Sequence, residues 1–304
     1  MTERDGLDQA QQLRNIIKAN NIAKPEARVI TVTSGKGGVG KSNTAINLAI
    51  QFRKMDKKVV ILDADFGLAN IEIMFGTVPK HNFCDMIYQG KSMKEIITWG
   101  PMDVGFVSGG SGIAGLSNLG KEYLTYIIGN LRELDSIADV IIIDTGAGIS
   151  DSVLEFLVAS GEILLVTTPE PTSITDSYSL LKALRRHPDF EEQAVRIKMV
   201  ANKVSGQEEG RILYDKLNSV VTRYLSLSME YLGAVPNDTH LSRAVMQQMP
   251  VSLQNPGAPS ALAYEEIAAR LMNVELNRNV ARRGMAALFA HMIGNKKNRG
   301  QGEN

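Results

Sequence analysis

Two lysines share one short glycine-rich segment, which points to chemistry on phosphate groups. Residues 35–42 read GKGGVGKS and lie between an apolar run and a helix-forming stretch. Glycines let backbone N–H groups turn toward phosphate oxygens, and the following helix adds the partial positive charge of its N-terminus. This pattern is a P-loop, in which Lys41 would reach the β- and γ-phosphates and the Ser42 hydroxyl would bind Mg²⁺. We therefore expect ATP or ADP with Mg²⁺, bound by Gly35, Lys36, Gly37, Gly38, Val39, Gly40, Lys41, Ser42 and Asn43.

Acidic residues follow two further apolar runs. Asp63 and Asp65 close one run, and Asp144 closes the run VIII. An acid at the end of a strand is often only a turn former. Three carboxylates at strand ends in a chain with a P-loop are a much stronger signal, because the carboxyl ends of parallel strands meet at one edge of a sheet.

The elements that must position these residues are short apolar strands alternating with helical patterns. We expect strands at residues 28–33, 58–63, 104–108, 140–144, 162–167, 196–202 and 231–235. Nearly continuous apolar runs indicate strands that are covered on both faces. The predicted fold class is therefore α/β, a doubly wound, mostly parallel sheet flanked by helices. We divide the chain into an N-terminal helix (residues 1–23), an ATPase domain (24–273) and a basic C-terminal tail (274–304).

The composition is that of an ordinary globular protein. Lys and Arg number 33, as do Asp and Glu, so no global field demands nucleic acid as a partner. The single cysteine, Cys84, excludes an internal disulfide framework and favours a reducing compartment. The N-terminus is too polar for a signal peptide, and no apolar run reaches transmembrane length. We expect a cytoplasmic protein.

The segment KGGVGKS resembles the deviant Walker A motif of the MinD/ParA family of ATPases. The resemblance implies that Lys36 reaches across an ATP-dependent homodimer to the phosphates of the partner copy. It also implies that Asp65 orients the attacking water, that Asp63 lies close to the Mg²⁺ ion, and that Asp144 holds the ion through water. A second cation near the transferring phosphoryl group would act as an arginine finger does in other enzymes. The catalytic residues expected on this basis are Lys36, Lys41 and Asp65, with Ser42, Asp63 and Asp144 at the metal.

Two segments resemble the family's adenine site. Asn202 ends the predicted strand KMVAN, at the position whose side-chain amide reads the base, and Pro236, Asn237 and Asp238 resemble the loop that cradles the ring. Asn, Asp and Pro also favour ordinary turns, so both interpretations stay open.

The first residues read as an amphipathic helix. Asp8, Gln9, Ala10, Leu13 and Arg14 match the Asp-Gln-Ala-x-x-Leu-Arg activator motif of the FlhG family of flagellar-number regulators. The resemblance implies docking on a signal-recognition-type GTPase, FlhF, and stimulation of its GTP hydrolysis. It further implies flagellar switch-complex (C-ring) proteins as partners, and it permits a flagellar transcriptional regulator as another. A helix that simply packs on the domain is the alternative.

The tail has helical spacing and no acidic residue between positions 277 and 299. Apolar residues on one face and arginines and lysines around them suit a helix on anionic lipid. This resembles the membrane-targeting tail of MinD-like proteins and implies reversible association with the inner face of the cell membrane. A helix packed on its own domain, or in the dimer groove, is the alternative. The residues expected to contact lipid are Met285, Leu288, Phe289, Met292 and Ile293.

Other functions of the same broad fold make different demands on the sequence. An iron–sulfur carrier would need a Cys-x-x-Cys motif, which a chain with only Cys84 does not have. A metabolic ligase would need a substrate pocket, and nothing in the sequence marks one. A ParA-like ATPase that positions DNA or cargo, or a septum-site regulator of the MinD type, stays an alternative to a flagellar regulator. Because the main basic cluster lies among apolar residues, we expect lipid and no direct nucleic acid.

Overall fold

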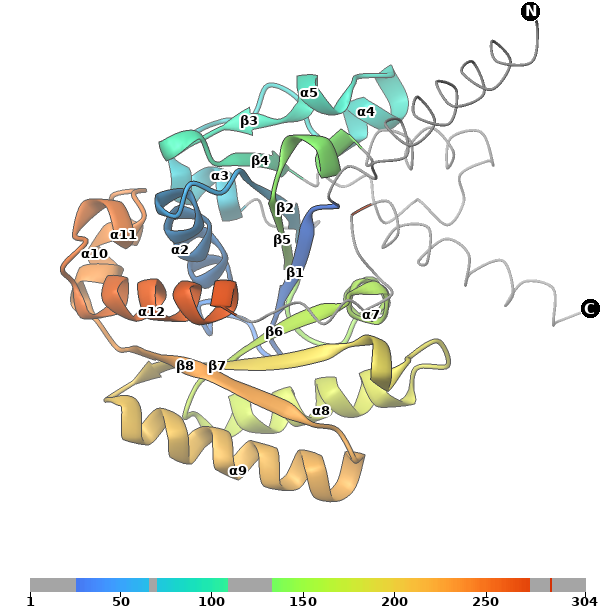
Figure 1. The fold of residues 1–304 in the computed structure, drawn as a ribbon, viewed down its shortest axis with the longest axis vertical. Coiled ribbons are helices and arrows are strands. Elements are labelled where there is room, and N and C mark those ends of the chain that lie inside the picture. The colour runs from blue at the N-terminus through green and yellow to red at the C-terminus, as the bar shows by residue number, and fades with distance from the viewer. Residues whose placement is uncertain (1–25, 66–69, 109–132, 274–284, 286–304) are drawn as a thin grey trace, which may run out of the picture.

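The computed structural model describes residues 26–65, 70–108, 133–273 and 285 of the 304-residue chain, and Figure 1 shows their arrangement. The predicted activator residues, from Asp8 to Arg14, lie outside the described residues. The same holds for Leu288, Phe289, Met292 and Ile293 of the tail.

One eight-stranded sheet organises the described residues. Its strand order is β3-β4-β2-β5-β1-β6-β7-β8, and every pairing is parallel except the antiparallel pair β3 and β4. This confirms the predicted fold class. The strands are β1 (Arg28–Thr33), β2 (Val59–Ala64), β3 (Thr98–Trp99), β4 (Gly105–Ser108), β5 (Val140–Thr145), β6 (Glu162–Thr167), β7 (Arg196–Val204) and β8 (Met229–Pro236).

All seven predicted strands are present, and β1 and β6 have the predicted bounds. The others shift by one or two residues at one or both ends. Strand β3 was not predicted, because a two-residue edge strand carries no periodic signal.

Helices cover both faces of the sheet, as the alternating side chains of β5 show. Val140 and Ile142 pack in the cluster that α2 and α12 cover, and Ile141 and Ile143 pack in the cluster on the opposite face. Figure 1 shows α2 beside α12 on one side of the sheet and α8 beside α9 on the other.

None of the described helices has the length and apolarity to cross a membrane. The α-helices are α2 (Lys41–Lys54), α3 (Asn70–Phe75), α4 (Phe83–Gln89), α5 (Met93–Ile96), α7 (Asp151–Ala159), α8 (Pro171–Arg186), α9 (Gln207–Leu225), α10 (Thr239–Met246), α11 (Val251–Gln254) and α12 (Pro259–Asn273), with 3-10 turns η1 (Pro101–Asp103) and η3 (Glu192–Ala194).

A buried ion cluster joins β1, β6 and β7 at the end of the sheet opposite the P-loop. The Glu162 carboxylate accepts hydrogen bonds from the Arg28 guanidinium at 2.7 and 2.8 Å and from the Lys198 ammonium at 2.7 Å. Burial raises the pKa of Glu162, but the two cations outweigh it and hold the pKa below its usual range. Arg28 also donates to the carbonyl of Leu271, which ties the end of α12 to the sheet.

Met285 is the one described residue of the tail, and it corrects one expectation. Its side chain is fully buried in the cluster that contains Ala27, Val29 and Phe156, and its backbone N–H donates to Asp135 at 3.1 Å. Met285 is therefore packed on its own domain and does not present an apolar surface to lipid in this conformation.

Candidate nucleotide-binding site

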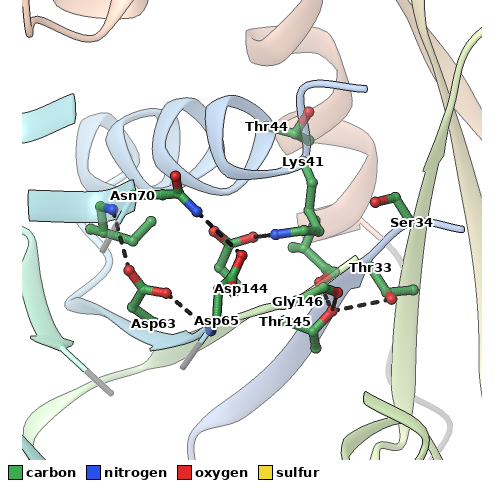
Figure 2. Close-up of polar contacts among 12 residues, drawn as sticks. Thr33, Ser34, Lys41, Thr44, Asp63, Asp65, Asn70, Asp144, Thr145 and Gly146 are labelled. Atoms are coloured by element: carbon green, nitrogen blue, oxygen red, sulfur yellow. Dashed lines mark hydrogen bonds and ion pairs between the residues drawn. The ribbon is translucent and has the colours of Figure 1, made fainter. Parts of the chain in front are cut away.

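The P-loop and the three acids come together because their strands are neighbours. Strands β2, β5 and β1 are adjacent and parallel, so the segments that follow them leave the sheet at the same edge. Asp63 and Asp144 are direct register partners in β2 and β5. Figure 2 shows Lys41, at the start of α2, reaching toward Asp144 with Asp63 and Asp65 beside them.

Close backbone contacts shape the P-loop. A side chain at Gly35 would overlap with the backbone of Asp176 and Ser177 in α8, so the loop lies directly against this helix. Gly40 has φ +93° and precedes α2, a conformation that glycine adopts far more readily than other residues. A side chain there would also overlap with the amide of Asn202.

Lys41 forms a buried ion pair with Asp144. The ammonium nitrogen lies 2.8 Å from Oδ1, and both side chains are almost completely buried. Burial raises the pKa of Asp144, and the charge of Lys41 opposes that shift. The second carboxylate oxygen, Oδ2, is buried and has no hydrogen-bond partner in the described residues. An unpaired, buried carboxylate oxygen is costly, which suits a group that has a further ligand to bind.

Asp63 holds the backbone that follows β2. Its Oδ1 accepts from the N–H of Asp65 at 3.1 Å, and its Oδ2 accepts from the N–H of Ile71 at 3.3 Å. Burial, together with the nearby charge of Asp144, raises the pKa of Asp63 to about 7. These contacts place Asp63 as a support for the segment between β2 and α3, next to the expected metal position.

Asp65 lies over the ends of β2 and β5. Its Oδ2 accepts from the side-chain amide of Asn70 at 3.3 Å, and its Oδ1 lies near Gly146. Its charge contributes to raising the pKa of Asp144. The structure therefore brings together the acids that the sequence predicts, Asp63, Asp65 and Asp144.

These residues fit a divalent cation bound together with a nucleotide. Among the described residues no group of three or more histidine, cysteine or acidic side chains forms a metal cage on its own. Mg²⁺ usually keeps several waters and takes one or two protein ligands plus substrate phosphates, so such a cage is not required. The unpaired Oδ2 of Asp144 and the hydroxyl of Ser42, which lies close enough to Asp144 to lower its pKa, are suitable ligands or water-holding groups.

Asn202 lies under the P-loop. Its amide nitrogen donates to the carbonyl of Val39 at 2.7 Å, and its Oδ1 is buried without a partner in the described residues. An unpaired amide oxygen matches the exocyclic amine of adenine. One end of the Asn202 amide thus supports the loop, and the other is available to a base.

Asp238 has a structural role that the sequence did not distinguish from base recognition. It caps α10 by accepting from the N–H of His240 at 2.8 Å, and its other oxygen accepts from the N–H and hydroxyl of Ser260 at 3.1 and 2.7 Å. These hydrogen bonds outweigh burial and lower the pKa of Asp238 to about 2. Asp238 therefore joins α10 to α12, while Pro236 ends β8 and the N–H of Asn237 donates to Val204.

Lys36 is separated from Lys41 although both belong to one loop. Its ammonium group lies at the surface, 2.6 Å from the Glu170 carboxylate and 2.9 Å from the Thr172 hydroxyl, at the start of α8. Lys36 lowers the pKa of Glu170. The loop thus has one buried lysine bound to an internal acid and one half-buried lysine at the surface, held by an exposed acid.

Three residues of this site were not predicted individually. Glu170 and Thr172 lie where β6 leads into α8, and nothing in the sequence pairs them with Lys36. Lys203 donates to the carbonyl of Gly38 at 2.8 Å. A lysine directly after a predicted strand can be seen in the sequence, but it does not by itself indicate a contact with the P-loop.

Comparisons with known proteins agree with this geometry. The family model described as "ParA: NUBPL iron-transfer P-loop NTPase" matches residues 26–272. This chain belongs to the ParA/MinD family of P-loop NTPases. Family membership indicates an ATPase. The iron-transfer activity in that description would need a pair of cysteines, and this chain has only Cys84.

Two similar relatives are named for flagella or for regulation. The antiactivator FleN of Pseudomonas aeruginosa is 36% identical over 252 residues, which cover 83% of this chain and 89% of FleN. The flagellum site-determining protein YlxH of Helicobacter pylori is 32% identical over 295 residues, covering 94% of this chain and 98% of YlxH. Both similarities place the chain close to FleN and YlxH within the family.

A solved structure supports the fold. The septum site-determining protein MinD of Pyrococcus horikoshii, complexed with Mg-ADP, superposes with a TM-score of 0.63 at 20% identity, over 81% of this chain and 96% of MinD. At this identity the match shows the shared fold of the sheet and its helices.

The contact between Gly35 and α8 leads to a prediction about stability. Gly35→Ala forces its methyl group into the backbone of Asp176 and should lower the free energy of unfolding by about 1–3 kcal/mol or more. Gly37→Ala is the matched control in the same loop, because its methyl group would meet no atom within 4 Å. Urea unfolding of both variants without nucleotide measures the difference. Equal stability of the two variants would contradict the described contact.

Proposed function

We propose that this chain is a MinD-like ATPase that acts as an ATP-dependent dimeric switch and regulates the number and placement of flagella. The similarity to FleN and YlxH over most of the chain supports the flagellar assignment. The separation of the two P-loop lysines supports the dimeric switch. ATP would close the dimer and hydrolysis would open it, so that each state offers different surfaces to partners.

The position of Lys36 is the observation that carries the switch. The loop's own phosphate-binding lysine is Lys41, which already lies in the buried site beside Asp144. Lys36 lies at the surface and is held only by groups that are themselves exposed. An exposed ion pair contributes about 0–1 kcal/mol, so releasing Lys36 toward the phosphates of a second copy costs little.

The other residues have separate roles in the proposed hydrolysis of ATP to ADP and inorganic phosphate. Lys41 exchanges its contact with Asp144 for the β- and γ-phosphates. Asp65 accepts a hydrogen bond from the attacking water and aligns it with the γ-phosphorus, opposite the leaving ADP oxygen. Asp144 and Ser42 would hold Mg²⁺, and Asp63 supports the segment that carries Asp65. When bound, Mg²⁺ neutralises charge on the β- and γ-phosphate oxygens.

Partner recognition is assigned to the N-terminal helix. We infer that Asp8, Gln9, Ala10, Leu13 and Arg14 dock on the FlhF-type GTPase and that Gln9 positions the water that attacks GTP, as a glutamine does within other GTPases. Flagellar switch-complex proteins, and a flagellar transcriptional regulator, are the further partners that this function implies.

The tail is proposed to bring the protein reversibly to the inner face of the cell membrane. Arginines and lysines around the apolar residues Leu288, Phe289, Met292 and Ile293 support contact with anionic lipid. Met285 is excluded from this set in the described conformation, because its side chain is buried in the domain.

Lys36→Ala tests the switch. In an Asp65→Ala background, which should bind ATP without hydrolysing it, the protein is expected to be dimeric with ATP and monomeric with ADP. Adding Lys36→Ala should leave it monomeric with both nucleotides while ADP affinity changes less than about threefold, since Lys41 is intact. Sedimentation velocity measures the dimer.

Lys36→Ala alone should lower ATP turnover by at least about a hundredfold. Unchanged pairing and turnover would disprove the switch.

Gln9→Ala tests the N-terminal helix. Stimulation of GTP hydrolysis by the FlhF-type GTPase should fall at least about tenfold because the water loses its positioning amide, whereas co-sedimentation of the two proteins should persist. Gln12→Ala, in the same segment but outside the motif, is the matched control and should keep full stimulation. Full stimulation by Gln9→Ala would contradict the proposed role of its amide.

Phe289→Ala and Met285→Ala separate the two parts of the tail. Phe289→Ala should reduce co-sedimentation with vesicles containing anionic lipid, in the presence of ATP, without changing the melting temperature. Met285→Ala should instead lower the free energy of unfolding by about 2–5 kcal/mol, because it empties a buried position. Vesicles of neutral lipid are the control. Vesicle binding that Phe289→Ala leaves intact would exclude the proposed lipid contact.

A further inference from the structure

Two consecutive residues at the end of β7 hold two consecutive carbonyl groups of the P-loop. Asn202 donates to the carbonyl of Val39 at 2.7 Å, and Lys203 donates to the carbonyl of Gly38 at 2.8 Å. Asn202 is buried, whereas Lys203 is exposed. Lys203 therefore extends from the surface over the loop and bonds to its backbone.

The backbone at Lys203 is arranged so that both side chains can point to the same loop. Consecutive side chains of a regular strand point to opposite faces of the sheet. Here Asn202 pairs with Val235 and Val204 pairs with Pro236, so Lys203 is an extra residue in the register. It has φ +57°, in the left-handed region that a lysine rarely adopts. The bulge breaks the alternation and brings Asn202 and Lys203 to one side.

The held carbonyls determine where the neighbouring N–H groups point. In a trans peptide the C=O and the following N–H point in opposite directions. Holding the carbonyls of Gly38 and Val39 toward the end of β7 directs the N–H groups of Val39 and Gly40 away from it. A row of N–H groups turned to the same side is the arrangement that binds phosphate oxygens.

We propose that Lys203 is a positioning residue that, together with Asn202, presets the P-loop backbone for the phosphates of the nucleotide. This inference rests on the proposed function, because it concerns the same site. A charge-assisted hydrogen bond is about twice as strong as a neutral one, so Lys203 restrains the peptide between Gly38 and Val39, which Gly38 would otherwise leave free to rotate. Retaining a left-handed lysine is consistent with this role, since strained backbone is kept where the surroundings or the function require it.

Lys203→Met tests the proposal, because it keeps the length of the side chain and removes the donor. Dissociation constants for ADP by calorimetry, and displacement of a fluorescent ADP by inorganic pyrophosphate, are measured on the full-length protein. Lys203→Met should weaken both by about tenfold to a hundredfold. Lys203→Arg should restore both to within about threefold of the wild type. Lys216→Met, an exposed lysine of α9, is the matched control and should bind normally.

A second variant separates positioning from stability. Lys203→Gly removes the donor and also the left-handed strain, so its melting temperature without nucleotide should be no lower than that of Lys203→Met, while its ADP affinity should be as weak. Wild-type affinity in Lys203→Met would overturn the inference. So would a loss of pyrophosphate binding that Lys203→Arg does not restore. A wild-type protein that binds no nucleotide would overturn the proposed function itself.

Discussion

A loop that binds phosphate through its N–H groups must turn its carbonyl groups the other way, and each of those carbonyls then needs a donor or water of its own. In this chain the donors come from the end of β7, where Asn202 and Lys203 bond to Val39 and Gly38. The other side of the loop is fixed by Gly35, which lies directly on the backbone of α8. The P-loop is therefore shaped by β7 and α8 as much as by the strand and helix that it connects.

The charges of the site depend on this geometry. Lys41 and Asp144 satisfy each other at 2.8 Å in the buried interior, while a second oxygen of Asp144 stays unpaired. The charge of Asp144 adds to burial in raising the pKa of Asp63 to about 7. Three acids near one lysine make a site with more negative than positive groups, and a divalent cation that enters with a nucleotide would relieve this repulsion.

Much of the fold could be predicted because its strands are continuous apolar runs, and the acids could be placed because they end such runs. The rest could not, for identifiable reasons. Asp238 caps α10, and its role could not be predicted because the same residue types cap helices and line binding loops. Lys203 joins the site through a bulge, whereas strand alternation would put it on the face opposite Asn202. Met285 belongs to an amphipathic pattern that fits lipid and protein equally, and only its burial distinguishes them.

In the proposed dimer, the surface contact of Lys36 would explain how a P-loop could distinguish ATP from ADP through a second copy. The pair with Glu170 is exposed, so it contributes little and is exchanged readily. The Lys36 ammonium group gains free energy by leaving Glu170 only where a stronger, less solvated anion is available. The γ-phosphate of a nucleotide enclosed between two copies is such an anion, because removing water strengthens every charge interaction inside the interface. ADP lacks that phosphate, so Lys36 would keep its own Glu170 and the copies would have no charge pair to hold them together.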